Sequence, residues 1–278
     1  MDYLFTHDQI EAIVHYVGLR GQKSRFSSTA NTLSGLSPTE ARALGMKPAY
    51  ETRYGWKSKY INPEIICWDG IMHLLYMYRN IFRAGMLTDE KRQYRTIRLC
   101  SSEEVIIGKS ISKSFISTSE SQITDLLALG YGNCPNLAII NYEIEPEAIV
   151  FQMSKLGQVY GKMEEQEILI LPGMQLEIML DPTHCYLTTG IDGKRATTYL
   201  AKVKGPDFSK YMNVNYNEIF SIVFDTQTLS IVREFYHQLN TSPTLPDVPG
   251  VYDRWVRAYK LLLMNHLYQT YKNNSWIL

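Results

Sequence analysis

Three groups of polar residues, each beside an apolar run, have side chains that can take part in chemistry. Arg98 lies inside the run 94–100, the run 114–119 ends in a serine/threonine cluster, and the acidic cluster 164–167 precedes the apolar run 168–171. A guanidinium can hold a phosphate through two parallel charge-assisted hydrogen bonds, and a carboxylate can stabilise a developing positive charge or accept a proton. Taken singly, each group is also typical of the solvated end of a strand.

The order and spacing of the three groups are more specific than any one of them. Ser117 follows Arg98 by 19 residues, Glu167 follows Ser117 by 50, and the aromatic Phe115 precedes the serine cluster. This pattern resembles the Arg–Ser-Thr-Ser–Glu-x-Glu class of mono-ADP-ribosyltransferases. That class includes the enzymatic components of clostridial and bacillary binary toxins and the vertebrate arginine-specific ecto-enzymes. The resemblance covers about residues 5 to 205.

The arginine of the pattern has two candidates. Leu99 follows Arg98, whereas the family commonly has glycine at that position, and Arg95 competes because Tyr-Arg is the commoner local form. The strand pattern and the following loop 101–104 favour Arg98.

The resemblance implies that NAD is the co-substrate, and it gives each motif residue a role. Arg98 would hold the diphosphate of NAD. Glu167 would stabilise the oxocarbenium-like sugar that forms as nicotinamide leaves, and would hold the ribose 2′-hydroxyl. Ser117 would orient the ribose and the glutamate. Thr118 and Ser119 complete the cofactor-binding strand and are expected chiefly to shape it.

Two further residues bear on the acceptor of ADP-ribose. In an extended segment Glu165 and Glu167 point to the same face, roughly 6.5–7 Å apart, so Glu165 could serve the incoming nucleophile as general base. In the family, Glu at this first position accompanies an arginine acceptor, and Gln accompanies asparagine or some nucleic-acid bases. Tyr160 lies where the family's target-recognition loop often carries an aromatic residue.

A basic segment near the N-terminus leaves a nucleic-acid acceptor open. Residues 18–60 contain eight Lys or Arg and two Glu, and the strip 50–60 alternates cations with aromatic rings. Phosphate neutralisation with base stacking would use such a strip. The alternative is a solvated surface whose tyrosines pack into a helical layer. The candidate recognition residues in the strip are Arg53, Tyr54, Trp56 and Lys57.

Composition and charge indicate an ordinary globular protein. The 278 residues carry 28 Lys and Arg against 28 Asp and Glu, and 45% are hydrophobic, which argues against disorder or a wholly nucleic-acid-binding surface. The four scattered cysteines suit free thiols, and neither they nor the six histidines show metal-ligand spacing. No Gly-rich nucleotide motif, membrane-spanning run or secretory signal is visible. We therefore expect a metal-free cytoplasmic protein, acting in the producing cell or in a target cell after delivery by a dedicated machine.

Hydrophobic periodicity predicts helices first and strands afterwards, which is typical of an α+β fold. Thr6 with Gln9 and Ser37 with Glu40 have the form of capping boxes, and Asn62 is expected to start a long helix ending near Gly85. A tight hairpin turn is expected at 192–193. The expected strands are 94–100, 112–117, 138–144, 148–152, 167–171, 176–180, 197–203 and 219–224, and the later helices are 226–239 and 251–271.

Together these observations predict a catalytic domain at 1–205, with a helical part at 1–90 and a β-rich core at 91–205, followed by a mainly helical extension at 206–278. The resemblance implies a split antiparallel β-sandwich around an NAD cleft. The predicted function is an ADP-ribosyltransferase toxin or effector that modifies protein arginine, or alternatively an RNA or DNA base as in a toxin–antitoxin or phage-defence system. An antitoxin or immunity protein would then be a partner. A non-catalytic binding protein on the same fold is the third hypothesis.

Overall fold

The computed structural model describes residues 5–17, 25–43, 62–88, 92–128, 136–156, 166–181, 196–241 and 247–274. They form two compact units, a helical unit within 1–84 and 208–278 and a sheet unit within 85–207. The helices at the two ends of the sequence therefore share one unit. All of the described strands belong to the sheet unit.

Local capping signals start two of the first helices as the sequence predicts. Thr6 N–H donates to Gln9 Oε1 at 2.8 Å and Gln9 N–H donates to Thr6 Oγ1 at 3.3 Å. Ser37 and Glu40 exchange the same pair of bonds at 2.7 and 3.2 Å. Both capping boxes are confirmed. The helices are α1 (His7–Val17), α2 (Arg25–Ser34), α3 (Pro38–Ala43), α5 (Trp68–Thr88), α7 (Tyr216–Val223), α8 (Thr226–Thr241) and α9 (Gly250–Asn274), with a short α6 (Ile123–Ala128) in the sheet unit.

Helix α5 differs from its prediction at both ends. Asn62 caps a short 3₁₀ turn, η1 (Pro63–Ile65), and α5 itself begins at Trp68. The helix continues through Gly85 to Thr88. A Cβ at Gly85 would lie 2.4 Å from Leu171 Cδ1 and 3.2 Å from Val150 O, so this glycine permits a close approach of helix and strands and does not end the helix.

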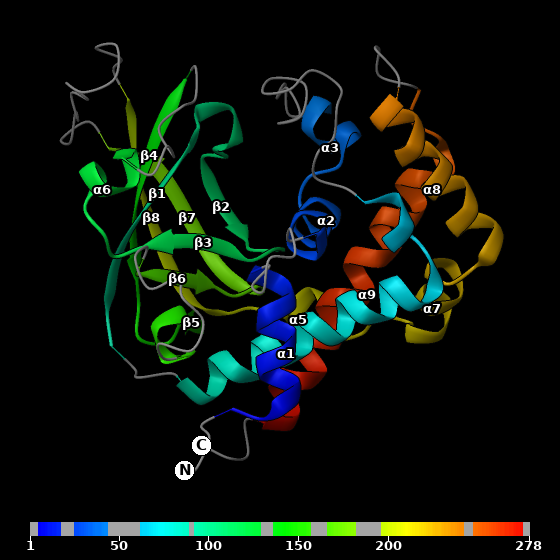
Figure 1. Ribbon diagram of the computed structural model, residues 1–278, viewed down its shortest axis with the longest axis horizontal. Helices are drawn as coiled ribbons and strands as arrows, with labels where there is room; N and C mark the ends of the chain where they lie inside the picture. Colours follow the sequence, from blue (N-terminus) through cyan, green and yellow to red (C-terminus); the bar gives the residue numbers. More distant parts are fainter. Residues whose placement is uncertain are drawn as a thin grey trace. The chain divides into compact units, whose positions relative to one another are not determined.

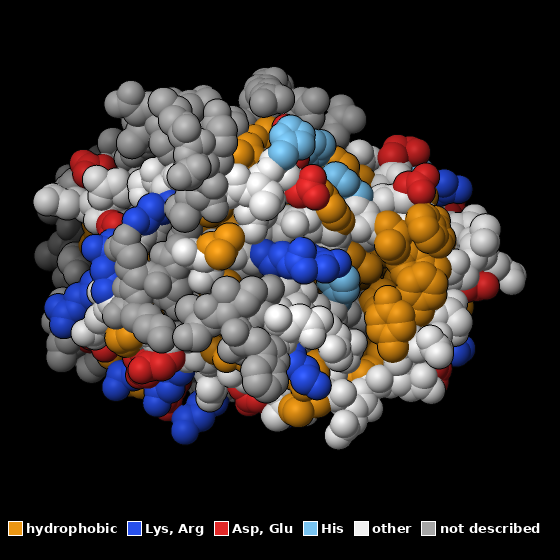
Figure 2. All heavy atoms as spheres, turned by 90° about the horizontal axis from the view of Figure 1, so that it is seen from below, with side chains coloured by type: hydrophobic (Ala, Val, Ile, Leu, Met, Phe, Trp, Pro, Cys, Tyr) orange, Lys and Arg blue, Asp and Glu red, His pale blue; other side chains and the backbone are white. Residues whose placement is uncertain are grey.

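The strand expected at 219–224 is wrong, because this segment lies in and just after helix α7. Tyr216, Phe220 and Phe224 follow one another at helical spacing, with ring centroids 5.8 and 4.4 Å apart, and Trp68 packs on Phe224 at 5.6 Å. Trp68 and Tyr216 are 50% and 44% exposed. Figure 2 shows hydrophobic side chains gathered in a patch on the side of the molecule where α7 and the start of α5 lie.

The C-terminal helix α9 contributes its apolar stripe to the core of the helical unit. It packs against α2, α7 and α8. Trp255 Nε1–H donates to Val223 O at 3.1 Å, which ties α9 to the end of α7. The stripe is therefore used inside the protein. Its buried members include Trp255, Tyr259, Leu262, Leu263 and Thr270, whereas Val251 at its start is exposed.

Eight strands form one mixed sheet in the order β2-β7-β8-β4-β1-β3-β6-β5 (Figure 1). The chain thus has a mixed α and β fold. The strands are β1 (Tyr94–Ser101), β2 (Gly108–Ile111), β3 (Ile116–Ser119), β4 (Leu137–Ile144), β5 (Val150–Gln152), β6 (Glu167–Ile170), β7 (Met174–Leu180) and β8 (Thr197–Pro206).

Two features of the pairing matter for the site. The predicted all-antiparallel arrangement is wrong for β4 and β8, which pair in parallel from Ala138↔Thr197 to Ile144↔Val203, because β5, β6 and β7 intervene between them in the chain. The five-strand group β2-β7-β8-β4-β1 is joined to the three-strand group β3-β6-β5 by one residue pair, Ile97↔Ser119. Of all neighbouring strands in the described sheet, β1 and β3 therefore share the shortest stretch of pairing.

The strand expected at 112–117 is wrong for residues 112–115, which connect β2 to β3, and is confirmed only where β3 begins at Ile116. The buried Ser112 Oγ donates to Leu171 O at 2.9 Å and accepts from Met174 N–H at 3.0 Å. Gly173, with φ of 96°, donates its N–H to Ser112 O at 2.7 Å. One serine thus holds the turn that follows β6.

We expect Ser112→Ala to destabilise the fold by about 2–3 kcal/mol, because it leaves a buried carbonyl and a buried N–H without their partner. Chemical denaturation monitored by circular dichroism measures this change. Ser110→Ala, two residues away on the exposed face of β2, is the matched control and should alter stability by less than about 0.5 kcal/mol. Equal effects of the two substitutions would contradict the role given to Ser112.

Within the described ranges, no helix is both long enough and apolar enough to span a bilayer. The same ranges contain no group of three or more His, Cys, Asp or Glu side chains that could hold a metal ion. The predicted turn at 192–193 lies outside the described residues.

Candidate functional site

The centre of the candidate site is a hydrogen-bonded pair from two neighbouring strands. Ser117 on β3 donates its hydroxyl to Glu167 Oε1 on β6, with an oxygen–oxygen distance of 2.5 Å. Such a short contact is typical of a hydroxyl bound to a carboxylate. Ser117 is exposed and Glu167 is half-buried, so a ligand can reach both. The two residues that the sequence places 50 positions apart are therefore in direct contact.

The strands hold this pair through contacts on both sides of it. Ser119 lies directly opposite Glu167 in the β3–β6 ladder. The buried Thr118 Oγ1 donates to Ile168 O at 2.8 Å, which ties β3 to β6 a second time. The buried Ser119 Oγ accepts from Ser121 N–H at 3.0 Å and shapes the turn after β3. Thr118 and Ser119 thus fix the strand, and their predicted contact with a cofactor stays a prediction.

The backbone immediately before Glu167 is not extended. Gln166 has φ of 41°, in the left-handed region that a non-glycine residue enters at a cost of roughly 1–2 kcal/mol. Its carbonyl accepts from Glu120 N–H at 3.2 Å, just after β3. The same-face relation of Glu165 and Glu167 was expected only for an extended segment, and here β6 begins at Glu167 while Glu165 lies outside the described residues. This kink sets the direction in which the chain enters the site.

Arg98 lies on β1, the strand next to β3. Its Nη2 is 3.4 Å from Glu104 Oε2 in the short 3₁₀ turn η2 (Ser102–Glu104), which the Ser101 hydroxyl caps. Both side chains are about one-third exposed, so the ion pair is open to solvent. The alternative candidate Arg95 is exposed and lies opposite Glu143 in the β1–β4 ladder.

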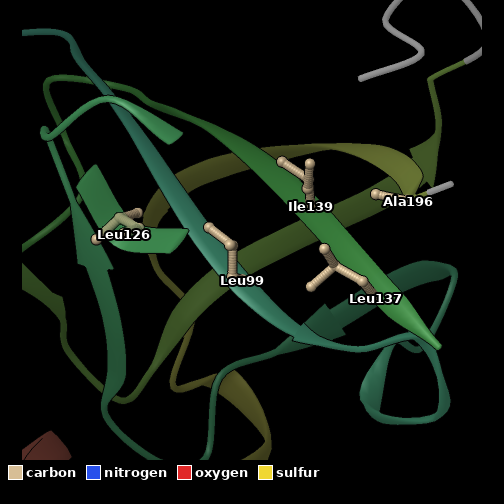
Figure 3. Packing of buried hydrophobic residues seen from close by; sticks show 5 residues of the cluster. All are labelled: Leu99, Leu126, Leu137, Ile139 and Ala196. Carbon is tan, nitrogen blue, oxygen red and sulfur yellow. The ribbon is translucent and has the colours of Figure 1, made fainter. Parts of the chain in front are cut away.

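A cluster of apolar side chains fixes β1 on one of its faces. Leu99 packs with Leu126 of α6 and with Leu137 and Ile139 of β4, and Figure 3 shows these side chains together with Ala196 at the start of β8. Ile97 packs against the same cluster. Alternation along β1 then places Arg98 on the opposite face from Ile97 and Leu99. Because Ile97 lies opposite Ser119 and Ser119 lies opposite Glu167, Arg98 is also on the opposite face from the Ser117–Glu167 pair, whereas Arg95 is on the same face as that pair.

On that second face of the sheet, a buried tyrosine of β4 lies close to Arg98. Burial raises the pKa of Tyr142 to about 12, and the positive charge of Arg98 acts in the opposite direction. The phenol is therefore neutral at physiological pH. Across β1, β3 and β6, the positions of Arg98, Ser117 and Glu167 span about 10 Å of sheet, given a strand spacing of roughly 4.8 Å.

Sequence reasoning missed some residues that shape the site and predicted others that lie outside the described ranges. Sequence reasoning missed two residues that shape the site, Glu104 as the partner of Arg98 and Gln166 as the kink before Glu167. The acidic residues after β1 were a signal for the first, whereas the sequence carries no glycine or asparagine that would signal a left-handed residue at 166. The predicted residues outside the described ranges are Arg53, Tyr54, Trp56, Lys57, Tyr160 and Glu165.

Three chemical capacities lie on neighbouring strands, with the Arg98 guanidinium on the opposite face of the sheet from the other two groups. They are an accessible carboxylate, a hydroxyl that holds this carboxylate, and an accessible guanidinium on the neighbouring strand. The carboxylate can stabilise a cation that develops on a bound sugar, and the guanidinium can bind a phosphate. All three groups belong to the sheet unit.

No family model and no curated protein matches the chain. Among solved structures, Vis toxin, an ADP-ribosyltransferase from Vibrio splendidus, is similar over 72% of this chain and 74% of that chain, with 14% identity and a TM-score of 0.38. An ADP-ribosyltransferase from Clostridium botulinum is similar over 72% of this chain and 89% of that chain, with 10% identity and a TM-score of 0.40. The enzymatic component of the Clostridium botulinum C2 toxin is similar over 73% of this chain, with 14% identity and a TM-score of 0.42. The match covers 45% of that protein, so this chain spans less than half of its length. The first two of these structural neighbours are ADP-ribosyltransferases, and the likeness to all three is distant in both sequence and backbone.

Proposed function

We propose that this protein is an NAD-dependent mono-ADP-ribosyltransferase, a toxin or effector that transfers ADP-ribose to a macromolecular acceptor. The observation that supports the proposal most directly is the 2.5 Å hydrogen bond between Ser117 and Glu167 in an accessible part of the sheet. The residue types and order resemble the Arg–Ser-Thr-Ser–Glu-x-Glu class. The narrow junction between β1 and β3 is where the proposed split of the sandwich, and the NAD cleft, would lie.

In the proposed reaction, the bond between the ribose C1′ and the nicotinamide nitrogen breaks, and nicotinamide leaves with the electron pair. The carboxylate of Glu167 stabilises the resulting positive charge on the ribose, and Ser117 holds that carboxylate in place. An arginine of β1 binds the diphosphate, for which we propose Arg98, with Arg95 as the alternative on the face of Ser117 and Glu167. The acceptor nucleophile then forms a bond to C1′ and loses its proton to a base, for which we propose Glu165.

We propose protein arginine as the acceptor, because Glu165 is the residue that accompanies a guanidinium acceptor in the resembling class. Tyr160 would contact the target. The basic and aromatic strip 50–60 supports a second candidate, an RNA or DNA base, since eight of the ten charged residues in 18–60 are cationic. An antitoxin or immunity partner would follow from either acceptor.

The proposal is tested by incubating the purified protein with NAD labelled in its adenylate portion, with cell lysate, purified RNA and purified DNA as parallel acceptors. We expect nicotinamide release and label on one acceptor class. Label on protein supports the arginine acceptor, and label on RNA or DNA supports the nucleic-acid acceptor. Failure of every acceptor to gain label, together with no nicotinamide release, would overturn the proposal in favour of a non-catalytic binding protein.

Ser117→Ala is expected to lower the rate of nicotinamide release by about 10–100-fold, because Glu167 loses the hydroxyl that orients it. Steady-state kinetics measure this effect, and Ser117→Thr, which keeps the hydroxyl, should recover part of the lost rate. Recovery is the informative result, since a merely structural role for the serine predicts no advantage of Thr over Ala.

A further inference from the structure

Two arginines of helix α5 have no acidic partner among the residues that the structure describes. Arg79 and Arg83 are one helical turn apart, so their side chains lie on the same stripe of the helix. The Nε atoms of both guanidinium groups are buried and have no hydrogen-bond partner within the described part of the chain. Both side chains are otherwise only half-buried, so the rest of each guanidinium reaches solvent.

Helix α9 adds a histidine to this pair. Burial, together with the positive charges of Arg79 and Arg83, lowers the pKa of His266 to about 4, which places the imidazole near both guanidinium groups. Burial and the neighbouring Arg79 also lower the pKa of Arg83. Two charged guanidinium groups, which repel each other, and an imidazole that is neutral at physiological pH therefore lie close together.

The helical unit supplies acidic partners elsewhere. Lys260, buried on α9 less than two turns before His266, is bonded to Glu40 Oε2 at 2.5 Å. One turn before Arg79 on α5, Tyr76 is hydrogen-bonded to Asp8 of α1, and the negative charge of Glu11 helps to raise its pKa. None of these acidic residues forms an ion pair with Arg79 or Arg83 in the described ranges. Like charges at half-buried positions are unfavourable unless an anion joins them.

We propose that Arg79, Arg83 and His266 form a binding site for the phosphate group of a small molecule. Two guanidinium forks offer parallel N–H donors that match phosphate oxygens, and their double positive charge matches a dianion better than a single carboxylate. The Nε–H donors, shielded from solvent, would gain their hydrogen bonds only when the anion is bound. This site lies in the helical unit and is independent of the function proposed above.

Thermal unfolding of the full chain in inorganic phosphate, against sodium chloride of equal ionic strength, tests the site. At a phosphate concentration roughly a hundredfold above Kd, we expect Tm to rise by about 3–5 °C relative to chloride. Arg79→Gln and Arg83→Gln should each weaken phosphate binding by about tenfold or more and remove at least about half of this rise. Without phosphate, neither variant should be less stable than the parent, since each removes a repulsive charge.

Arg257→Gln, at an exposed position of α9, is the matched control and should keep the full phosphate effect. If a glutamine variant fails to fold, Arg79→Lys keeps the charge and loses the fork, and calorimetric titration with phosphate should then show weaker binding. An equal Tm rise in chloride, or an undiminished rise in both glutamine variants, would overturn the proposal. Sedimentation with phosphatidic acid vesicles separates a lipid source, and binding to vesicles without binding to free phosphate would also overturn it.

Discussion

Glu167→Gln is expected to lower the rate of nicotinamide release from NAD by about 10²–10³-fold, because it removes the negative charge that faces the developing oxocarbenium ion. The substitution preserves shape, and the amide oxygen of glutamine can still accept the hydrogen bond from Ser117 Oγ. We therefore expect the fold and the affinity for NAD to change little. Quantification of free nicotinamide, alongside NAD binding by calorimetry, separates the loss of rate from a loss of binding.

Glu177→Gln is the matched control for this experiment. Glu177 also lies on a strand of the sheet unit and is partly exposed, but its neighbour is Lys109 at 3.9 Å on β2, away from the Ser117–Glu167 pair. The control variant should retain the parental rate. A Glu167→Gln protein that turns over NAD as fast as the parent would remove the carboxylate from the mechanism. Equal losses in both variants would indicate a general effect of removing charge.

Local signals in the sequence predicted those elements whose stability is decided by neighbouring residues. The capping boxes at Thr6 and Ser37 form because the backbone N–H groups at a helix start need an acceptor nearby. Strands such as β1 and β4 appear close to their expected bounds, because their β-branched and aromatic residues favour a pleated strand. Periodicity does not predict that these two strands pair, because pairing depends on how separate segments of the chain fold together.

The wrong predictions concern a short apolar segment that suits either a helix or a strand, and features that depend on distant parts of the chain. Ile219 and Val223 are both buried in α7, and their spacing of four serves a helix, whereas the short apolar run 219–224 alone also suits a strand. Gly85 was expected to end a helix, but it lies within α5, where the close packing of Leu171 accounts for a residue without a Cβ. The parallel pairing of β4 with β8 could not be predicted, since it depends on the path of three intervening strands.

For the candidate site, the sequence predicted one contact that the described residues contain. Ser117 and Glu167 are in contact as the resemblance implies, and the hydrogen bond follows from the register of β3 and β6. The left-handed Gln166 could not be foreseen, because its conformation is held by the bond to Glu120 N–H and not by its own residue type. The acceptor roles of Glu165 and Tyr160 stay predictions.

The second large effect concerns Arg98, the arginine proposed to bind the diphosphate. Arg98→Lys is expected to raise the Kd for NAD by about 10–100-fold, because lysine keeps the charge but cannot make two parallel hydrogen bonds to a phosphate. The rate at saturating NAD should change far less, since the diphosphate is bound equally in the ground state and the transition state. Calorimetric binding and the separation of KM from kcat measure the two effects.

Arg95→Lys on the same strand distinguishes the two candidate arginines. Arg95 is exposed opposite Glu143, three residues before Arg98 and farther from the η2 turn, so the substitution should leave NAD affinity unchanged. Glu104→Gln adds a third comparison. It removes the charge that competes with phosphate for the Arg98 guanidinium, so it should keep or improve NAD affinity if Arg98 binds the diphosphate. Loss of affinity in Arg95→Lys with no loss in Arg98→Lys would move the phosphate-binding role from Arg98 to Arg95, on the face of β1 that Ile97 shares with Ser119 and Glu167.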